Sequence, residues 1–290
     1  MSTARYVLIT PVRNEAEHIS HTLDSVLAQT TRPQRWVIVS DGSTDATDEI
    51  VRRYAEENSL IRFLRREPDP NRNFGSKVRA IQCGLERLAD VEYEYIGNLD
   101  GDVAFTPEYF EKLFDQFESD PKLGIGGGLI HEMIAGRWTP AVMSPTWSVS
   151  GAVQMFRREC FDQVGGYIPL PYGGVDAVAE GMARMHGWRV RTFTDLPVHH
   201  YGRVGAVGRS VLRAFYDKGR REYVIGYHPV FGAVRSISRM RAAPFVVGGL
   251  SYAAGFYGAV LQRRKPAVPP EYVRFLRREQ LRRLFGGGTR

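Results

Sequence analysis

The stretch YVLITPVRNEAEHISHTLDSVLAQ, Tyr6 to Gln29, decides the fold class, because an apolar run leads directly into an amphipathic one. Tyr6–Val12 is apolar and rich in β-branched residues, which predicts a short buried strand. In Glu15–Gln29 the apolar residues recur every three or four positions, which is the spacing of one helix face. The chain therefore begins with a predicted strand and a predicted helix, joined by a polar turn.

The same alternation continues through the first 120 residues. Apolar runs predict strands, and amphipathic runs between them predict helices. This order indicates an α/β protein with a mostly parallel sheet and helices on both faces. Further strands are expected at 35–41, 61–66 and 93–100, and further helices at 43–58, 76–90 and 107–119. Ligands of such sheets bind at the carboxyl ends of the strands, where this chain has the polar segments TPVRNE, SDGSTD and LDGDV.

Asp100 and Asp102 raise a question, because two like charges follow an apolar run with only Gly101 between them. Each carboxylate makes the other harder to ionise. One explanation is a simple turn, since Asp and Gly are turn residues. The other is a hard divalent cation, which prefers oxygen ligands and would relieve the repulsion. Taken alone, the three residues favour the turn, and only the rest of the chain favours the cation.

The second half of the α/β pattern is less regular. A glycine-rich strand is expected at 123–130, a helix from about 158 to a stop at Gly165, and a helix in 173–187 followed by a strand. A dinucleotide-binding site needs Gly-x-Gly-x-x-Gly after the first strand, and this chain has PVRNE there instead. A Walker A loop is also absent from the sequence.

Composition and charge narrow the class of protein. The 290 residues are 43% hydrophobic and 24% charged, as in ordinary globular proteins. Cys83 and Cys160 have no metal-ligand spacing and are expected to be small buried residues in a reducing compartment. The first apolar run is too short for a signal peptide, so secretion is not expected. The net charge of +7 is uneven: residues 1–200 hold 21 Lys and Arg against 28 Asp and Glu, and residues 201–290 hold 18 against 4.

The basic last third also contains an uncharged run, Ala242–Gln262, with Arg residues on both sides. At 1.5 Å per residue it is roughly as long as a bilayer core is thick, but it is rich in Gly and Ala, so a re-entrant or interfacial element fits better than a crossing. Pro270–Phe285 has the pattern of a basic amphipathic helix at a membrane surface. The alternative is a buried helix packed on a globular domain, followed by a solvated tail.

Six segments of the chain resemble family 2 glycosyltransferases with the GT-A fold. They occur in the order of the family between about Arg5 and Val207. Each segment alone is a weak signal, but six in order are specific. The resemblance implies transfer of a sugar from a nucleotide-sugar donor, with a UDP-sugar favoured, and a divalent metal, Mn²⁺ or Mg²⁺. The six segments are TPVRNE, VSDGSTDAT, GSKVRAIQCGL, NLDGD, GAVQMFRRECFDQVGGY and DAVAEGMARMHGWRV.

The resemblance assigns roles to residues on the donor side. Asp100 and Asp102 match the Asp-x-Asp motif, in which the metal neutralises the charge that develops on the departing diphosphate. It implies that Asp102 is the more direct metal ligand, and that Asp100 divides its contacts between metal and donor. Asp41 matches the position that reads the nucleobase, although an N-cap or turn would also explain it. Pro11, Glu15 and Lys77 match positions at the nucleotide. Glu15 would equally be explained as a partner of the helix dipole in a first helical turn, and Lys77 as a solvated charge on a helix.

Asp176 is the candidate catalytic base by the same resemblance. The family has an acidic pair here, and this chain has Val175 in place of the first acid. The expected role is to remove the proton of the acceptor hydroxyl while that oxygen attacks the anomeric carbon, which inverts its configuration. Glu180 lies one helical turn later and is the alternative base. An N-cap would also account for Asp176.

His199 and His200 follow the next expected strand, where the family often has a metal- or diphosphate-binding His. Neighbouring strand residues point to opposite faces, so at most one of them should reach the metal. The sequence does not indicate which one.

The sequence thus predicts three parts: residues 1–120 as the nucleotide-sugar-binding half of a GT-A domain, 121–210 as its acceptor-binding half, and 211–290 as a basic, membrane-associating helical region. The expected function is an inverting, metal-dependent glycosyltransferase (hexosyltransferase type) of polysaccharide biosynthesis. Its acceptor would be a cell-surface or lipid-linked glycan, met at the cytoplasmic face of an anionic membrane. The alternative is a non-catalytic sugar-nucleotide or glycan-binding module. A nucleic-acid partner is not expected, because the basic region contains an apolar run and no RNA-binding motif.

Overall fold

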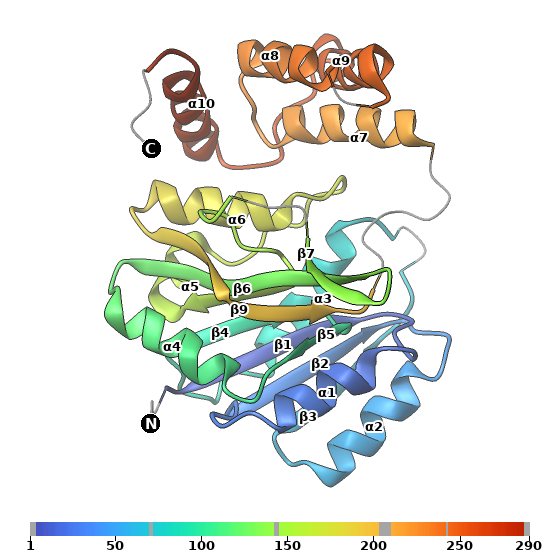
Figure 1. Ribbon diagram of the computed structural model, residues 1–290, viewed down its shortest axis with the longest axis vertical. Helices are drawn as coiled ribbons and strands as arrows, with labels where there is room; N and C mark the ends of the chain where they lie inside the picture. Colours follow the sequence, from blue (N-terminus) through green and yellow to red (C-terminus); the bar gives the residue numbers. More distant parts are fainter. Residues whose placement is uncertain (1–3, 70–71, 142–144, 203–209, 242, 287–290) are drawn as a thin grey trace. The chain divides into compact units, whose positions relative to one another are not determined.

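The strands and helices of the first 200 residues form one α/β unit in the computed structural model (Figure 1). The structure describes residues 4–69, 72–141, 145–202, 210–241 and 243–286. The chain divides into two units: the α/β unit, Met1–Pro169 with Val175–Val204, and the helical unit, Leu170–Gly174 with Gly205–Arg290. The α/β unit thus contains residues 1–120 and most of 121–210, while Leu170–Gly174 and the residues from Gly205 on belong to the helical unit. Val207, where the resemblance ends, and Ala242, where the uncharged run begins, lie outside the described residues.

The elements of the α/β unit follow the predicted order. The strands are β1 Tyr6–Val12, β2 Arg35–Asp41, β3 Ile61–Arg66, β4 Tyr95–Leu99, β5 Val103–Phe105, β6 Leu123–Ile134, β7 Arg137–Pro140, β8 Val153–Arg157 and β9 Arg189–His200. The helices are α1 Ile19–Leu27, α2 Thr47–Glu57, α3 Gly75–Glu86, α4 Tyr109–Ser119, α5 Arg158–Val164 and α6 Val175–Met185. Gly165 caps α5 in the left-handed conformation, as its sequence predicts.

The strands form a single mixed sheet in the order β3-β2-β1-β4-β8-β6-β9-β5, with β7 paired to β6. β1 to β4 are parallel, because each pair is joined through a helix, and β6 is parallel to β9. β8 lies antiparallel to β4 and β6, and β5 antiparallel to β9. The sheet is therefore mixed: its first half is parallel, as predicted, and its second half contains strands of both orientations.

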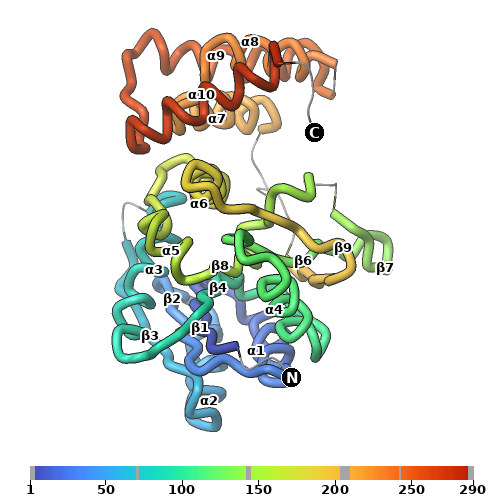
Figure 2. Tube along the Cα trace, turned by 90° about the vertical axis from the view of Figure 1, so that its left-hand side faces the viewer, coloured from blue at the N-terminus to red at the C-terminus, as the bar shows by residue number. Residues whose placement is uncertain are grey.

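Helices cover both faces of the sheet, as predicted. One face packs against α1, α2 and α4, in a core that includes Tyr6, Trp36, Phe110 and Phe114. The other face packs against α3, where Gly84 lies so close to Ile9 that a Cβ would come within 2.7 Å of that side chain. Figure 2 shows α1 and α4 on one side of the sheet and α3 and α5 on the other. Because helices cover both faces, the strands are held in place, and ligands can reach them at their ends.

Two predicted helix starts were too early. α1 begins at Ile19 and α2 at Thr47, several residues later than the amphipathic pattern indicated. The Oγ of Ser43 lies 3.0 Å from that of Ser40, and the backbone N–H of Thr44 donates to Asn14 at 2.8 Å. These residues therefore tie two turns together instead of capping α2.

The helical unit contains α7 Val211–Val224, α8 Pro229–Arg239, α9 Phe245–Leu261 and α10 Pro270–Phe285. α9 holds most of the uncharged run, and it packs backbone to backbone on α7 through glycines. A Cβ at Gly255 would lie 2.0 Å from the Tyr216 carbonyl oxygen, and one at Gly219 would lie 2.1 Å from the Tyr252 carbonyl oxygen. The glycines that the sequence shows therefore serve helix packing. None of the described helices is long and apolar enough to cross a membrane.

α10 differs from its predicted role as a surface helix. Tyr272, Leu276 and Gln280 are buried, and the Gln280 side chain accepts a hydrogen bond from the His228 backbone N–H at 2.8 Å. Its inward side is thus occupied by the helical unit itself. Tyr272 and Leu276 therefore help to hold this helix in the fold.

Candidate active site

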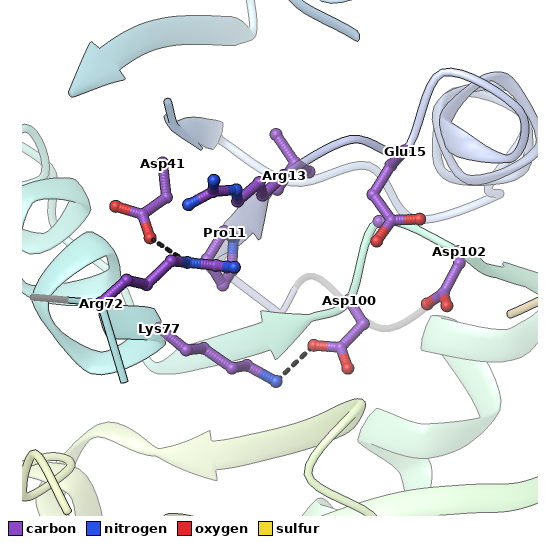
Figure 3. Close-up of a pocket in the computed structure, with 10 residues that line it drawn as sticks. Pro11, Arg13, Glu15, Asp41, Arg72, Lys77, Asp100 and Asp102 are labelled. Carbon is purple, nitrogen blue, oxygen red and sulfur yellow. Dashed lines mark hydrogen bonds and ion pairs between the residues drawn. The ribbon is translucent and has the colours of Figure 1, made fainter. Parts of the chain in front are cut away.

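A cleft at the carboxyl ends of β1, β2 and β4 gathers every donor-side residue that the sequence predicted (Figure 3). Parallel strands end at one edge of a sheet, which brings residues far apart in the chain together. The cleft is lined by Pro11, Val12, Arg13, Glu15, Asp41, Arg72, Lys77, Asp100, Gly101 and Asp102. Figure 3 shows Glu15, Asp100 and Asp102 on one side and Asp41 with Arg72 on the other.

Asp41 is held by two arginines. Its side chain is 6% exposed, and its two oxygens accept from Arg66 at 2.7 Å and from Arg72 at 3.3 Å. A buried carboxylate needs such partners to stay charged. Since a carboxylate has about four acceptor positions, Asp41 can still accept a further N–H. It is not a helix cap, because α2 begins six residues later.

Lys77 connects the cleft to the loop before β8. Its Nζ forms an ion pair with Asp100 and lies 3.3 Å from the Gly151 carbonyl oxygen. The Asn98 side chain donates to the same oxygen at 2.9 Å, and the Asp100 backbone N–H donates to Ala152 at 2.9 Å. Lys77 is therefore not a solvated helix charge. The loop around Gly151 is attached to the Asp-x-Asp segment through these contacts.

Negative charge accumulates around Asp102. Burial, followed by the charges of Asp102 and Asp100, raises the pKa of Glu15 to about 7. The Asp102 side chain is 14% exposed, and its buried Oδ1 has no hydrogen-bond partner among the residues that the structure describes. A buried carboxylate oxygen lowers the stability of the fold unless a cation or a hydrogen-bond donor contacts it.

His200 and His199 point to different surroundings, as the strand geometry requires. His200 Nε2 lies 3.3 Å from Asp102 Oδ2, and this contact raises the pKa of His200. His199 stacks on the Trp138 ring, with centroids 4.3 Å apart, and burial lowers its pKa. His200 is thus the histidine beside the Asp-x-Asp segment.

The residues of the cleft fit a divalent cation that a diphosphate helps to hold. Within the described ranges no group of three or more His, Cys, Asp and Glu side chains is arranged to bind a metal ion on its own. Asp100 and Asp102 supply hard oxygen donors, and the unpartnered Oδ1 of Asp102 has the chemistry of a missing cation contact. Arg13 makes no ion pair in the described part of the chain, so its charge is available to an anion in the same cleft.

Asp176 lies beside this cleft, on the other side of the Gly151 loop. It is the second residue of α6, and it packs so closely that a Cβ at Gly151 would lie 3.1 Å from its Oδ2. The charges of Asp176 and Asp100 both contribute, after burial, to raising the pKa of Tyr167. The predicted base and the Asp-x-Asp segment are therefore separated by one loop.

Glu180, the alternative base, is buried within the fold. It is 3% exposed, and its Oε1 accepts from the Val149 backbone N–H at 2.7 Å and from Gln154 Nε2 at 3.2 Å. The Oη of Tyr167 donates to Gln154 at 2.8 Å. Glu180 therefore holds the Gly151 loop and is not placed to meet an acceptor.

We expect Glu180→Gln to change how stability depends on pH. Burial raises the pKa of Glu180 from 4.5 to about 7, so the unfolded chain ionises first as pH rises. The carboxyl group's cost to stability therefore grows as pH rises from 4.5 to about 7, and it stays at about 1–3 kcal/mol at higher pH; below 4.5 it costs none. Gln keeps the acceptor for Val149 and cannot ionise. The melting temperature of the variant, relative to the natural protein, should rise across this interval.

The matched control for that measurement is Glu159→Gln, in the first turn of α5, where the carboxylate is exposed. Its melting temperature should follow that of the natural protein at every pH. A difference between Glu180→Gln and the natural protein that stays constant with pH would show that the pKa of Glu180 is the same in the folded and the unfolded chain.

Sequence reasoning missed three features of the site. Arg13 stands inside the quoted segment TPVRNE, so its place between Pro11 and Glu15 was a usable signal. Arg66 and Arg72, the partners of Asp41, come from a strand end and a loop with no motif. The structural role of Glu180 depends on burial, which helical spacing does not reveal.

The fold is a mixed α/β sheet, and the cleft at its strand ends holds paired carboxylates and cations. Comparison with known proteins gives the family. Glycosyl transferase family 2 matches residues 7–167, more than half of the chain. The chain belongs to this family and is a glycosyltransferase by that membership.

Similar proteins agree with this family. The succinoglycan biosynthesis protein ExoA of Rhizobium meliloti is 23% identical over an alignment of 277 residues that covers 86% of this chain and 79% of ExoA. The poly-beta-1,6-N-acetyl-D-glucosamine synthase of Staphylococcus aureus is 33% identical over 111 residues, 38% of this chain but only 25% of that enzyme. Both names refer to polysaccharide biosynthesis.

A solved structure supports the GT-A fold. The mannosyltransferase PcManGT from Pyrobaculum calidifontis, in complex with GDP-Man and Mn²⁺, matches with a TM-score of 0.57. The alignment covers 99% of this chain and 89% of PcManGT at 18% identity. At that identity the likeness supports the fold and not the substrate.

Proposed function

We propose that this chain is an inverting, metal-dependent glycosyltransferase that moves a sugar from a nucleotide-sugar donor to a hydroxyl of a growing glycan. One observation carries the proposal: Asp100 and Asp102 converge with Glu15, Lys77 and the free Arg13 in one cleft. This is a charge arrangement for a diphosphate with a divalent cation, on a chain of glycosyl transferase family 2.

On the donor side, Asp102 and Asp100 would hold Mn²⁺ or Mg²⁺, with His200 beside them. When bound, the cation neutralises charge on the leaving diphosphate. Arg13 and Lys77 bring positive charge to the same phosphates. Asp41, oriented by its two arginines, accepts an N–H of the nucleobase, for which we propose uridine. Pro11 and Glu15 border the nucleotide.

On the acceptor side, Asp176 takes the proton of the attacking hydroxyl. Its support is its position against Gly151, one loop away from the Lys77–Asp100 ion pair. A single displacement from the side opposite the diphosphate inverts the anomeric carbon. The acceptor is proposed to be a cell-surface or lipid-linked glycan, presented at the cytoplasmic face of a membrane, since ExoA is named for succinoglycan biosynthesis.

A panel of nucleoside diphosphates tests this function. We expect UDP with Mn²⁺ or Mg²⁺ to raise the melting temperature by several degrees, because a ligand that binds only the folded protein stabilises it. Without the metal the shift should be much smaller. If GDP raises the melting temperature and UDP does not, the nucleobase of the donor is guanine and not uracil. Nucleotide binding without any transfer to glycan acceptors would favour the non-catalytic sugar-nucleotide-binding module.

A further inference from the structure

The helical unit exposes an unusual amount of apolar surface. Fifteen large apolar side chains are exposed among the described residues, and eleven of them belong to this unit. Nine of the eleven lie on α7, α8 and the first turns of α9, and we call these nine the apolar face. They are Val211, Leu212, Val230, Val234, Ile237, Phe245, Val246, Val247 and Leu250.

Contacts between the three helices join these residues into one surface. Ser251 Oγ donates to the Leu212 carbonyl oxygen at 2.7 Å, which places the start of α7 beside α9. A Cβ at Gly249 would lie 2.6 Å from the Ser236 carbonyl oxygen, which places α8 on the other side of α9. Ile237 and Leu250, each next to one of these contacts in sequence, are 58% and 55% exposed. In both views α8 and α9 run side by side (Figures 1 and 2).

Positive charge surrounds the apolar face. Residues 210–241 hold seven Lys and Arg against two Asp and Glu, and residues 243–262 hold no charge. One of the two acids, Glu222, is buried and paired with Arg235 and Arg239. Arg213 follows Leu212 in the chain and pairs with Asp217 at 3.3 Å, and Arg241 lies four residues before Phe245; both arginines are exposed. An apolar centre with a basic rim matches an anionic lipid surface, whereas a second copy would bring like charges together.

We propose that the apolar face docks on an anionic lipid bilayer, with its side chains in the interface and Arg213 and Arg241 over the headgroups. The helices lie on the bilayer without crossing it, and α10 takes no direct part because its inward side is buried in the helical unit. The inference depends on the proposed function in one respect: it names the surface by which the enzyme meets a membrane-presented acceptor.

The glycine contacts between α7 and α9 make this face a rigid platform. Buried Tyr252 donates a hydrogen bond of 2.5 Å to Glu222, and Phe256 stacks within the same core. Because the inner side is packed in this way, the outward valines and leucines stay exposed in the folded unit. Exposed residues can therefore be replaced with little effect on folding.

Vesicle flotation of the full chain tests the proposal. The natural protein should float with phosphatidylcholine vesicles that contain phosphatidylglycerol, and much less with pure phosphatidylcholine. Val247→Ser with Leu250→Ser should reduce partitioning on the order of 100-fold, since each exposed aliphatic side chain contributes about tenfold when buried in lipid. Arg213→Gln with Arg241→Gln should also reduce it, as should high salt.

Two matched controls locate the surface. Met133→Ser with Ile134→Ser removes exposed apolar side chains from the α/β unit, and Phe285→Ser removes one from the end of α10. Both variants should float like the natural protein. The proposal is overturned if the natural protein does not float, if the Val247 and Leu250 variant floats normally, or if Phe285→Ser abolishes flotation.

A fluorescent variant tests the same surface independently, in case the serine variant does not fold. All four tryptophans of the chain, at positions 36, 138, 147 and 188, lie in the α/β unit. Leu250→Trp should therefore add emission that shifts to the blue with anionic vesicles. An unchanged spectrum with vesicles would overturn the proposal. A blue shift that appears without lipid and grows with protein concentration would also overturn it, and would indicate that a second copy of the chain covers the face. Neither measurement uses the sugar donor or measures turnover. The membrane proposal can therefore be refuted while the proposed transferase activity is confirmed.

Discussion

Asp102→Ala should abolish sugar transfer and remove the metal dependence of nucleotide binding. The side chain is nearly buried, its Oδ1 has no partner, and its charge adds to those of Glu15 and Asp100. Without it the proposed cation loses its more direct protein ligand, and the diphosphate leaves without that neutralisation. Loss of one well-placed electrostatic contact costs 10²–10³ in turnover, and loss of the ion costs more. Transfer assays and calorimetry of UDP with and without Mn²⁺ measure both effects.

The control for Asp102 is Asp195→Ala, an exposed carboxylate of β9 in the same unit. It should retain the activity and metal dependence of the natural protein. Asp102→Ala also removes the partner of His200, so its melting temperature must be measured beside its activity. A folded Asp102→Ala variant with full transfer, or full transfer by the natural protein in excess chelator, would refute the metal assignment.

Sequence patterns predicted the strands of the first half closely, and physics explains why. β1 and β2 have the expected bounds because each is a buried β-branched run between polar residues. α2 was placed too early because Ser43 bonds to Ser40 within its own turn, and Thr44 bonds to Asn14 in a turn that is distant in sequence. The site residues at strand ends could be predicted, since the carboxyl ends of parallel strands lie at the same edge of the sheet.

Other parts of the site depend on burial and tertiary partners, which a single sequence does not contain. Asp41 was found at a strand end, but its arginine partners were not, because a charged loop residue looks the same whether paired or solvated. Glu180 and Asp176 share a helix, and only the structure shows that Glu180 bonds to the backbone of Val149. The uncharged run had the composition of a membrane element and also of a glycine-packed helix.

Asp176→Asn should reduce turnover by roughly 10²–10⁴ while leaving nucleotide binding unchanged. Asn keeps the shape and the contact with Gly151 but cannot accept a proton, and general-base catalysis contributes about this factor. The Lys77–Asp100 pair and the contacts of Asp41 do not involve Asp176, so UDP affinity with Mn²⁺ should hold. Steady-state transfer assays and calorimetry give the two quantities separately.

Glu180→Gln provides the decisive comparison for the base. Glu180 accepts backbone and side-chain hydrogen bonds that Gln can still accept, so its variant should keep most of its turnover. The Asp176 variant should also lose the acidic limb of the pH–rate profile, because that limb reports ionisation of the base. If Asp176→Asn is nearly as active as the natural protein and Glu180→Gln is inactive, then the loop held by Glu180 opens during turnover and Glu180 is the base.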